Sequence, residues 1–526
     1  MCLLQRGGNR FPQTAVKDPL PHADARTRVW LPSLSVMIWI TLFLGLNLTS
    51  ARIVLISADS DPALHRRLGE WMLQHHDVVR EDSLLHTHQG PFVSMEWLSD
   101  VLFAAAGRVG GWNGLVFIAA TVIATCFWLL RRQLLADGCD AILATVLVLV
   151  AMLTCSMHWL ARPLLFTHLL MLVFAWQLRW FEQGRVSSRR LFLLLPPLMV
   201  LWVNLHGGFA LGLMLLAMYA VGSTLNSLRQ PTSRNKSWIL TILLFVCGAA
   251  SLLNPNGWKL HLHILRFLAS PELATATTEF ASPNFHSVGM HGFLLLLFLL
   301  GMALLVIRPK FNPTDVLLVG GWGYFALLSA RNVPIFALVV TPLLAQWILG
   351  FLQVSERTWW CRLYREWAAG IIPRDGAAGT AIVITVVVCL TLVTAKPSIA
   401  GGAPVLATDF PPDRYPTDVV DYLQAHPSLV HGEMFNLFIW SGYLEFSFPE
   451  HKPFVDSRND FYGVDLMREF RAANEPKPGW EAVFARYHVE WTMLPPQHPL
   501  NQILQLRTDW QLVFSNRQAL VYSRRP

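Results

Sequence analysis

Two acidic residues stand close behind the first long apolar run of the sequence and are the first candidates for chemistry. The stretch SADSDPALHRRLGEW, residues 57–71, contains Asp59 and Asp61. A carboxylate at the end of such a run can take a proton from a hydroxyl group. Asp61 also fits a structural role, because Asp is a favoured helix N-cap and proline suits the first helical position. No predicted helix needs Asp59, and a solvated loop residue is the alternative there.

A second acidic pair and a histidine are further candidates. Glu96 and Asp100 are four residues apart, so their carboxylates lie on one face of a helix and could complete an acidic site with Asp59. A solvated helix face is the alternative for this pair. His206 precedes two glycines, which permit a tight reversal and the close approach of a substrate. A plain helical hairpin would explain the same residues.

Four basic residues are candidates for holding a phosphate group. They are Arg162, Lys259, Arg266 and Arg331. Guanidinium groups bind phosphate through paired hydrogen bonds, and an ammonium group binds it as a point charge. A hydrogen bond to the last carbonyls of a helix is the alternative for these side chains. Together with Glu96, Asp100 and His206 they form the predicted substrate-binding set.

The composition indicates that these residues belong to a membrane protein. Of the 526 residues, 53% are hydrophobic and only 14% are charged, whereas about a quarter of an ordinary globular domain is charged. The 41 Lys and Arg residues outnumber the 34 Asp and Glu residues. Because the basic residues cluster at the ends of apolar runs, they indicate membrane orientation, and no nucleic-acid partner is expected.

Apolar runs divide most of the chain into about eleven predicted membrane spans, since a span takes about 20 apolar residues. They lie at 33–56, 112–130, 140–158, 162–181, 190–204, 208–227, 237–253, 291–307, 314–329, 333–352 and 377–395. The sequence therefore predicts an all-α polytopic membrane bundle over residues 33–395 that rests in the lipid bilayer.

The basic residues predict which connections face the cytoplasm. They mark every second connection and the N-terminal arm, residues 1–32. Positively charged connections stay in the cytoplasm, so the arm is predicted to be cytoplasmic. With an odd number of spans, the connections 57–111 and 254–290 and the C-terminal region then lie outside. The four phosphate-binding candidates are cations on that outer side, which orientation does not explain.

Two outer segments have secondary structure of their own. Leu64, Leu68 and Met72 share one face of an amphipathic helix in the first outer loop. Residues 404–526 alternate between predicted helices and short β-type runs, and therefore form a predicted extracytoplasmic α/β domain. The predicted helices are 416–425 and 479–487, and the predicted strands are 452–456, 489–494, 511–515 and 519–523.

No pattern in the sequence predicts a cysteine, histidine or nucleotide site. Seven cysteines occur without a C-x-x-C pair. Histidine pairs with one residue between them, such as His86 with His88, diverge on a helix and point to opposite sides of a strand. A Walker-type loop, a G-x-G-x-x-G element and an H-E-x-x-H helix are all missing. No metal ligands are therefore assigned.

The order of these features resembles the GT-C superfamily of polyprenyl-phosphate-sugar-dependent glycosyltransferases. The D-S-D of residues 59–61 fits the D-x-D or E-x-D signature of their first outer loop. An amphipathic helix, many spans and an outer C-terminal domain follow. The further motifs that resemble bacterial members are RRLGEW (66–71), SMEWLSD (94–100), WVNLHGGF (202–209), LNPNGW (253–258), SPNFHS (282–287) and SARNVP (329–334). The similarity covers most of the chain.

The resemblance implies transfer of a hexose or pentose from a polyprenyl-phosphate-linked sugar to a periplasmic acceptor, which is a glycan, a lipid or a protein. It implies a multi-pass protein of the bacterial inner membrane, with Asp59 as the base and Asp61 as its companion. A divalent metal ion, which some members use, stays open. The alternative is a non-catalytic scaffold or a transporter of lipid-linked glycans on the same fold. Because the predicted spans hold almost no charge in their middle, the sequence favours chemistry at the outer surface.

Overall fold

The computed structural model describes residues 33–525 with short gaps. The gaps fall at residues 83, 230–233, 271, 273–277, 356–357, 372–379 and 396–407. The predicted cytoplasmic arm, residues 1–32, lies outside the described residues.

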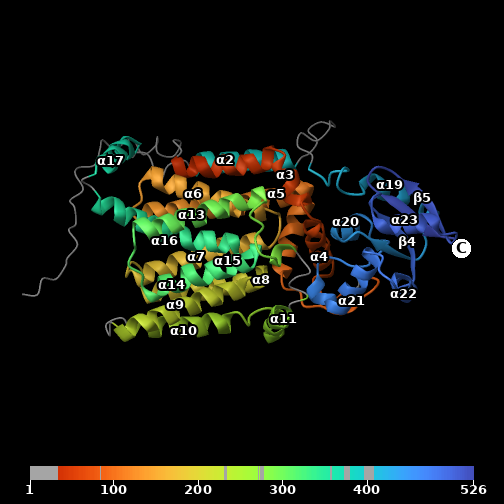
Figure 1. Ribbon diagram of the computed structural model, residues 1–526, viewed down its shortest axis with the longest axis horizontal. Coiled ribbons are helices and arrows are strands. Elements are labelled where there is room, and N and C mark those ends of the chain that lie inside the picture. Colours follow the sequence, from red (N-terminus) through yellow and green to blue (C-terminus); the bar gives the residue numbers. More distant parts are fainter. Residues whose placement is uncertain are drawn as a thin grey trace, which may run out of the picture.

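Apolar helices lie side by side along one axis and form a bundle (Figure 1). Their bounds are α2 Leu34–Leu48, α3 Ala51–Ser57, α5 Trp97–Ala136, α6 Ala141–Cys155, α7 Leu164–Glu182, α8 Ser188–Leu205, α9 Phe209–Arg229, α10 Arg234–Ala250, α13 His291–Val306, α14 Pro313–Val316, α15 Trp322–Leu328, α16 Val333–Val354 and α18 Thr380–Ala395. Two further helices, α11 Trp258–Leu268 and α17 Trp359–Ile371, lie near opposite ends of the bundle (Figure 1).

In the part of the chain that the structure describes, seven helices are long and apolar enough to cross a membrane. The bent pair α2 and α3, whose axes differ by 70°, would make an eighth span. The chain is therefore a multi-pass membrane protein. The predicted number of about eleven spans is not confirmed, because α10, the α14–α15 segment and α18 are not among these helices.

The connections of the bundle alternate between its two ends. At one end, Lys236 donates a hydrogen bond to the carbonyl of Glu182 at 2.6 Å, and Tyr364 donates one to Asp140 at 2.7 Å. The C-terminal region covers the other end (Figure 1). The basic connections thus meet at the end away from the C-terminal region, which agrees with the predicted alternation. The assignment of that end to the cytoplasm remains a prediction.

Helix α5 joins the first outer loop to the bundle. The sequence predicts a helix from about Ser94 that runs into the second span, and the structure has one helix of 40 residues that is broken at Gly110 and Gly111. Gly111 has φ 57° and ψ −142°, a conformation that only glycine adopts readily. The first arm of α5 can therefore lie outside the bundle axis while the second arm enters it.

The amphipathic helix α4, Asp61–His75, packs on α5. Its buried apolar residues Leu64, Leu68 and Met72 form the predicted face. The two helices cross so closely at Gly69 that a Cβ atom there would lie 1.9 Å from the carbonyl oxygen of Asp100. Apolar burial and this close crossing together hold α4 against the first arm of α5.

The start of α4 corrects one detail of the sequence prediction. Ser60 is the N-cap residue and Asp61 is already the first helical residue, so Asp61 is not the N-cap. Asp59 Oδ1 accepts the backbone N–H of Asp61 at 3.1 Å. Asp59 therefore satisfies one of the donors at the helix start, a structural role that the sequence did not indicate.

The C-terminal region contains a four-stranded sheet in the order β3-β4-β6-β5. Strand β3 pairs with β4 in parallel, and the other pairs are antiparallel. The strands are β3 Glu433–Asn436, β4 Val489–Leu494, β5 Trp510–Ser515 and β6 Leu520–Arg524. The helices around them are α19 Thr417–Ala425, α20 Ser441–Ser447, α21 Asn459–Asn474, α22 Trp480–Arg486 and α23 Pro499–Leu506.

One predicted strand of this region, 452–456, is wrong, and the four-residue strand β3 was not predicted. Residues 452–456 pair with the first outer loop instead of the sheet. His86 N–H donates to the carbonyl of Pro453 at 3.4 Å, and the Thr87 hydroxyl donates to that of Phe454 at 2.5 Å. The other three predicted strands match β4, β5 and β6 to within a residue at each end.

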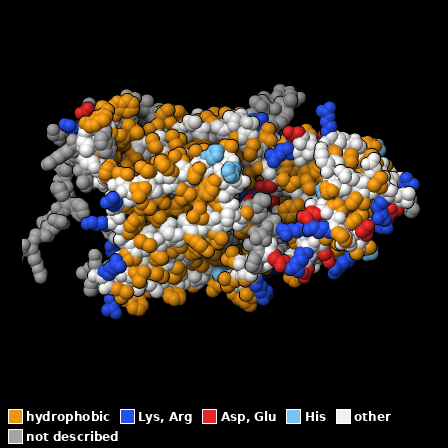
Figure 2. All heavy atoms as spheres, in the orientation of Figure 1, with side chains coloured by type: hydrophobic (Ala, Val, Ile, Leu, Met, Phe, Trp, Pro, Cys, Tyr) orange, Lys and Arg blue, Asp and Glu red, His pale blue; other side chains and the backbone are white. Residues whose placement is uncertain are grey.

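The C-terminal region rests directly on the first outer loop. Tyr415 donates a hydrogen bond from its hydroxyl to the carbonyl of Ser57 at 3.1 Å, and the N–H of Gly442 donates to Ser60 Oγ at 3.1 Å. Arg458 forms an ion pair with Asp82, in the short strand β1 Glu81–Asp82 that pairs with β2 Gly90–Pro91, at 2.9 Å. Figure 2 shows hydrophobic side chains over the bundle and charged side chains gathered over the C-terminal region.

The α4–α5 crossing yields a stability prediction. Gly69→Ala should lower the free energy of unfolding by about 1–3 kcal/mol, because the new methyl group meets backbone that cannot move aside cheaply. The measurement is the midpoint of thermal unfolding in detergent. Gly45→Ala in α2 is the matched control, since nothing lies within 4 Å of the point that a Cβ atom would occupy there. Equal midpoints for Gly69→Ala and the wild type would contradict this account of the crossing.

Candidate active site

Arg162 stands at the centre of an ion cluster at the end of the bundle that the C-terminal region covers. Its Nε donates to Asp59 Oδ1 at 3.1 Å, and its Nη1 donates to Glu279 Oε1 at 2.7 Å. Its Nη2 lies 3.1 Å from Asp61 Oδ2 and also contacts Asp59 Oδ2. One guanidinium group thus serves three carboxylates, and only 17% of its side chain is exposed.

The backbone around Arg162 fixes the guanidinium group in this position. The residue precedes Pro163, the N-cap of α7. The neighbouring N–H of Ala161 donates to the carbonyl of Leu55 in α3 at 2.7 Å. Because α3 ends only two residues before Asp59, this hydrogen bond holds Arg162 and Asp59 side by side.

The carboxylates around Arg162 differ in proton affinity. Burial raises the pKa of Asp59 to about 6, although the charge of Arg162 opposes that rise. Burial also disfavours the ionised form of Glu279, but the charges of Arg162 and Arg331 outweigh it and lower that pKa to about 2. Arg162 itself stays charged, because its three carboxylates raise its pKa against the effect of burial. Asp59 can therefore exchange a proton near neutral pH, whereas Glu279 stays ionised there.

A second acidic group surrounds Glu96, the N-cap residue of α5. Glu96 Oε1 lies 3.1 Å from His206 Nε2, and its Oε2 lies 3.6 Å from His65 Nε2. His65 Nδ1 makes a hydrogen bond of 2.8 Å with Asp100 Oδ1. Burial raises the pKa of Glu96 to about 7. Burial works against the charged form of His65, but Asp100 and Glu96 raise its pKa to about 9, so this imidazole is cationic.

The hydrogen bonds of His206 determine its tautomer. Nδ1 accepts the backbone N–H of Gly208 at 3.0 Å and contacts the hydroxyl of Thr167 at 2.7 Å. Burial and the charge of Arg331 lower the pKa of His206 well below its usual range, so the imidazole is neutral. Its proton therefore lies on Nε2 and points at Glu96.

Arg331 connects the two groups and is only loosely paired. Its Nη1 lies 3.8 Å from Glu279 Oε2, and its Nη2 lies 3.5 Å from His206 Nε2. Because His206 Nε2 carries a proton, the second contact joins two donors and is not a good hydrogen bond. The guanidinium group lies over the ring of Phe280 at 5.1 Å, and 31% of the side chain is exposed. Arg331 is thus more accessible than Arg162.

The structure brings seven of the nine predicted site residues into one polar network. They are Asp59, Asp61, Glu96, Asp100, Arg162, His206 and Arg331. Lys259 and Arg266 lie exposed on α11, and neither makes an ion pair or a side-chain hydrogen bond with a described residue of the network.

Sequence reasoning did not select two members of this network. Glu279 lies in the 3-10 turn Thr278–Phe280 and had no motif to mark it. His65 follows Asp61 by one helical turn, a spacing that puts both side chains on one face of α4.

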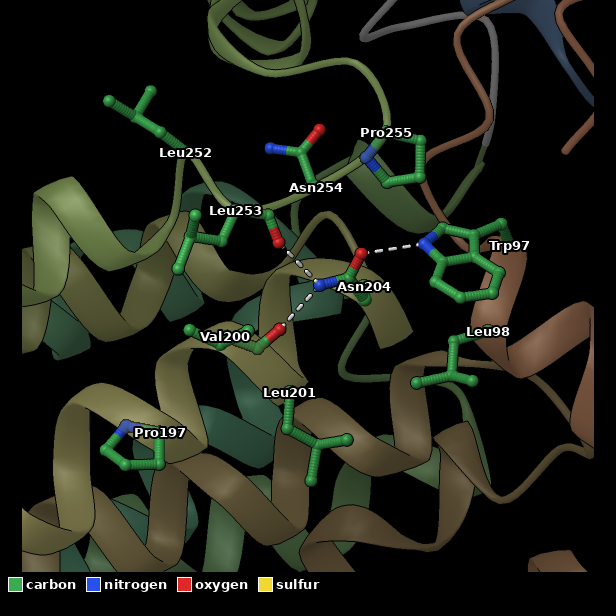
Figure 3. Close-up of a pocket in the computed structure, with 10 residues that line it drawn as sticks. All are labelled: Trp97, Leu98, Pro197, Val200, Leu201, Asn204, Leu252, Leu253, Asn254 and Pro255. Atoms are coloured by element: carbon green, nitrogen blue, oxygen red, sulfur yellow. Dashed lines mark hydrogen bonds between the residues drawn. The ribbon is translucent and has the colours of Figure 1, made fainter.

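An apolar cavity of about 670 Å³ lies between residues of α5, α8 and the segment Leu252–Pro255 (Figure 3). Its lining residues are Trp97, Leu98, Pro197, Val200, Leu201, Asn204, Leu252, Leu253, Asn254 and Pro255. Asn204 lies between the walls: its Oδ1 accepts the indole N–H of Trp97 at 2.7 Å, and its Nδ2 donates to the carbonyl of Leu253 at 2.9 Å. Trp97 follows Glu96 and Asn204 is two residues from His206, so two lining residues of the cavity are near neighbours of the acidic group along the chain.

The carboxylates do not form an evident metal site. No group of three or more His, Cys, Asp or Glu side chains that could hold a metal ion occurs among the residues that the structure describes. Asp59, Asp61 and Glu279 point at Arg162 instead.

Comparison with known proteins finds solved structures that share the fold of this chain. No family model and no curated protein matches the chain. Among solved structures, the oligosaccharyltransferase AglB from Archaeoglobus fulgidus, in complex with an inhibitory peptide and a dolichol-phosphate, is 12% identical with a TM-score of 0.53. The match covers 88% of this chain and 69% of AglB. The same enzyme tethered to an acceptor peptide has a TM-score of 0.52 at 13% identity, over 87% of this chain and 68% of the other. The chain therefore shares its fold with these oligosaccharyltransferase structures, in agreement with the fold that the resemblance of its motifs implied.

Proposed function

We propose that the chain is a membrane glycosyltransferase that moves a sugar from a polyprenyl-phosphate donor to an acceptor at the periplasmic face of a bacterial inner membrane. One observation carries this proposal: a network of buried acids and bases lies at the end of an apolar bundle, and near neighbours of its members along the chain line an apolar cavity. The GT-C fold supports it, since AglB is described in complex with a dolichol-phosphate. The acceptor is a glycan, a lipid or a protein.

The cavity and Arg331 suit the two parts of such a donor. The lining of the cavity is mostly apolar, as an isoprenoid chain requires. Arg331, whose two polar contacts are 3.5 and 3.8 Å long, belongs to the same polar network as Glu96 and His206. Every nitrogen of Arg162 already contacts a carboxylate. Arg331 is therefore the cation that we assign to the donor phosphate, with Arg162 in a different role.

Asp59 is the base that we assign to the acceptor. A carboxylate has about four lone-pair sites. Asp59 uses three of them, for the N–H of Asp61, for Nε of Arg162 and for its Nη2. The fourth, on Oδ2, can take the proton of an acceptor hydroxyl or amide.

The reaction is then a single displacement. The acceptor oxygen or nitrogen forms a bond to the anomeric carbon, and the bond between that carbon and the phosphate oxygen breaks. The proton goes to Asp59, and the bonding electrons leave with the polyprenyl phosphate, whose charge Arg331 stabilises.

The central test removes the base without changing its shape. Asp59→Asn should lower transfer about 10²–10⁴-fold, the usual contribution of a general base. The assay is mass spectrometry of glycolipids, glycans and glycoproteins in deletion cells of the source organism that carry wild-type or variant chain. Asp77→Asn is the matched control, because Asp77 lies exposed at the end of α4.

Two results would contradict the assignment. Wild-type amounts of product with Asp59→Asn would exclude Asp59 as the base. The second result is that deletion of the chain changes only the location of a lipid-linked glycan, while the purified chain binds that glycan without transferring its sugar. That result would favour the scaffold or transporter.

The proton affinity of Asp59 predicts a pH dependence. Its pKa of about 6 means that Asp59 is protonated, and cannot accept a proton, below that pH. The value of kcat/KM should therefore fall tenfold per pH unit as the pH drops below about 6. The Glu96→Gln variant should show the same fall of kcat/KM below pH 6. A fall of kcat/KM that begins near pH 7 in the wild type and is absent in Glu96→Gln would identify Glu96 as the base instead, since its pKa is about 7.

The role of Arg331 predicts a binding defect without a folding defect. Arg331→Gln should weaken the binding of a short-chain polyprenyl phosphate about 10- to 100-fold, the worth of one charge-assisted hydrogen bond. Arg331→Lys should recover part of this loss. The thermal midpoint should hardly change, because both polar contacts of Arg331 are long. Arg517→Gln, an exposed arginine beyond β5, controls for the loss of charge, and an equal defect there would contradict the assignment.

A further inference from the structure

Three carboxylates from two separate parts of the chain converge on one point. Asp59 and Asp61 stand at the start of α4, and Glu279 comes from the 3-10 turn before α13. Three oxygen-bearing side chains around one point are a common arrangement for a divalent cation. The resemblance of the sequence to the GT-C superfamily raises the same possibility of a metal ion. Here the point of convergence holds the guanidinium group of Arg162.

The space between these carboxylates is too small for a second cation. The nitrogens of Arg162 lie 2.7 Å from Glu279 Oε1, 3.1 Å from Asp61 Oδ2 and 3.1 Å from Asp59 Oδ1. A divalent ion needs its oxygen ligands at about 2.0–2.6 Å on several sides at once. Those oxygens already face N–H groups, so the three side chains do not fit a metal ion while Arg162 is in place.

The backbone on either side of Arg162, and not only the charge of its side chain, fixes its position. The chain on either side is fixed, by the hydrogen bond from Ala161 to Leu55 and by Pro163 at the start of α7. Glu279 is fixed in turn, because its carbonyl accepts the hydroxyl of Ser329 at 3.1 Å and Ala330 N–H donates to Ala281 at 2.9 Å. The cation and its anions therefore belong to a built arrangement of α3, α7 and two 3-10 turns, Thr278–Phe280 and Ala330–Asn332.

We infer that Arg162 is a built-in cation that takes the place of a divalent metal ion among Asp59, Asp61 and Glu279, so that this chain works without one. Arg162 acts as a positioning residue. It orients Asp59 and balances part of the charge of Asp61 and Glu279, while the acceptor approaches the open lone pair of Asp59. The inference rests on the proposed function only for its catalytic consequence, because the metal-binding behaviour can be measured without any substrate.

The test uses Mn²⁺ as the probe and the purified full chain in detergent, after treatment with a chelator. The variants are Arg162→Ala, Arg162→Lys and the double variant Arg162→Ala with Glu279→Gln. Bound Mn²⁺ is measured by electron paramagnetic resonance, and the thermal midpoint is measured with and without Mn²⁺. Where the products of transfer are known, activity is measured with the chelator present.

The wild type and Arg162→Lys should bind no Mn²⁺ at this site, and their midpoints should not respond to it. Arg162→Ala leaves three carboxylates without their cation, so it should bind Mn²⁺ and gain stability from it by mass action. The double variant, which has lost one ligand, should bind Mn²⁺ more weakly. Wild-type transfer should survive the chelator, and Arg162→Ala should lose about 100-fold, as a misplaced base would. Added guanidinium ion should restore part of that loss.

One equivalent of Mn²⁺ bound by the wild type and lost in Asp61→Asn would overturn the inference. So would transfer by the wild type that stops with the chelator and returns with Mn²⁺. If Arg162→Ala does not fold, the titrations of the wild type and Asp61→Asn still decide the question. A wild type that binds no Mn²⁺ and transfers no sugar would support the built-in cation and contradict the proposed function.

Discussion

The arrangement of the site depends on one interaction, the ion cluster in which Arg162 serves Asp59, Asp61 and Glu279. Removing a charged group from water costs several kcal/mol, and only close opposite charges and hydrogen bonds offset that cost. No member of this cluster can leave without exposing the others to an unbalanced charge in a region of low dielectric. The cluster therefore fixes the start of α4, the turn at Thr278–Phe280 and the approach to α7 relative to one another.

Burial and nearby charges also explain why Asp59 and Glu96 both have pKa values near neutral, although their surroundings differ. Asp59 shares its guanidinium group with two other carboxylates, whereas Glu96 faces a neutral His206 and a cationic His65. Burial raises both pKa values, and the neighbouring cations limit the rise. Two groups with neutral-range pKa values in one network are typical of sites where protons move. Arg331 lies between them, and its long contacts leave its charge available to an anion.

The sequence was enough to predict most residues of the candidate site, but it did not predict which of them contact one another. Residue type and side of the membrane were enough to select Asp59, Arg162 and Arg331, since a charged residue is costly there without a partner. The same reasoning selected Lys259 and Arg266, which are exposed on α11, because lying on one side of a bilayer does not set a distance. Glu279 was missed because Arg162, the partner that places it in the cluster, is 117 residues away in the sequence.

The sequence predicted the class of fold, a helical membrane bundle with a C-terminal α/β region, more accurately than the bounds of its individual elements. Apolar runs identify helices, but hydropathy does not reveal where each helix ends or that α5 continues through Gly110 and Gly111. In the C-terminal region, residues 452–456 have β-type composition, yet they bond to the first outer loop, a tertiary contact that overrides local preference.

The hydrogen bonds that tie Ser57 and Ser60 to Tyr415 and Gly442 have a mechanical consequence. They flank Asp59 on both sides, and Ser57 ends α3, the helix to which Ala161 beside Arg162 is also bonded. A rigid tilt of the C-terminal region would thus act on the carboxylate of Asp59 through Ser60, and on the guanidinium group through α3. An acceptor large enough to lean on that region could in this way set the alignment of the base from a distance, and a small one could not.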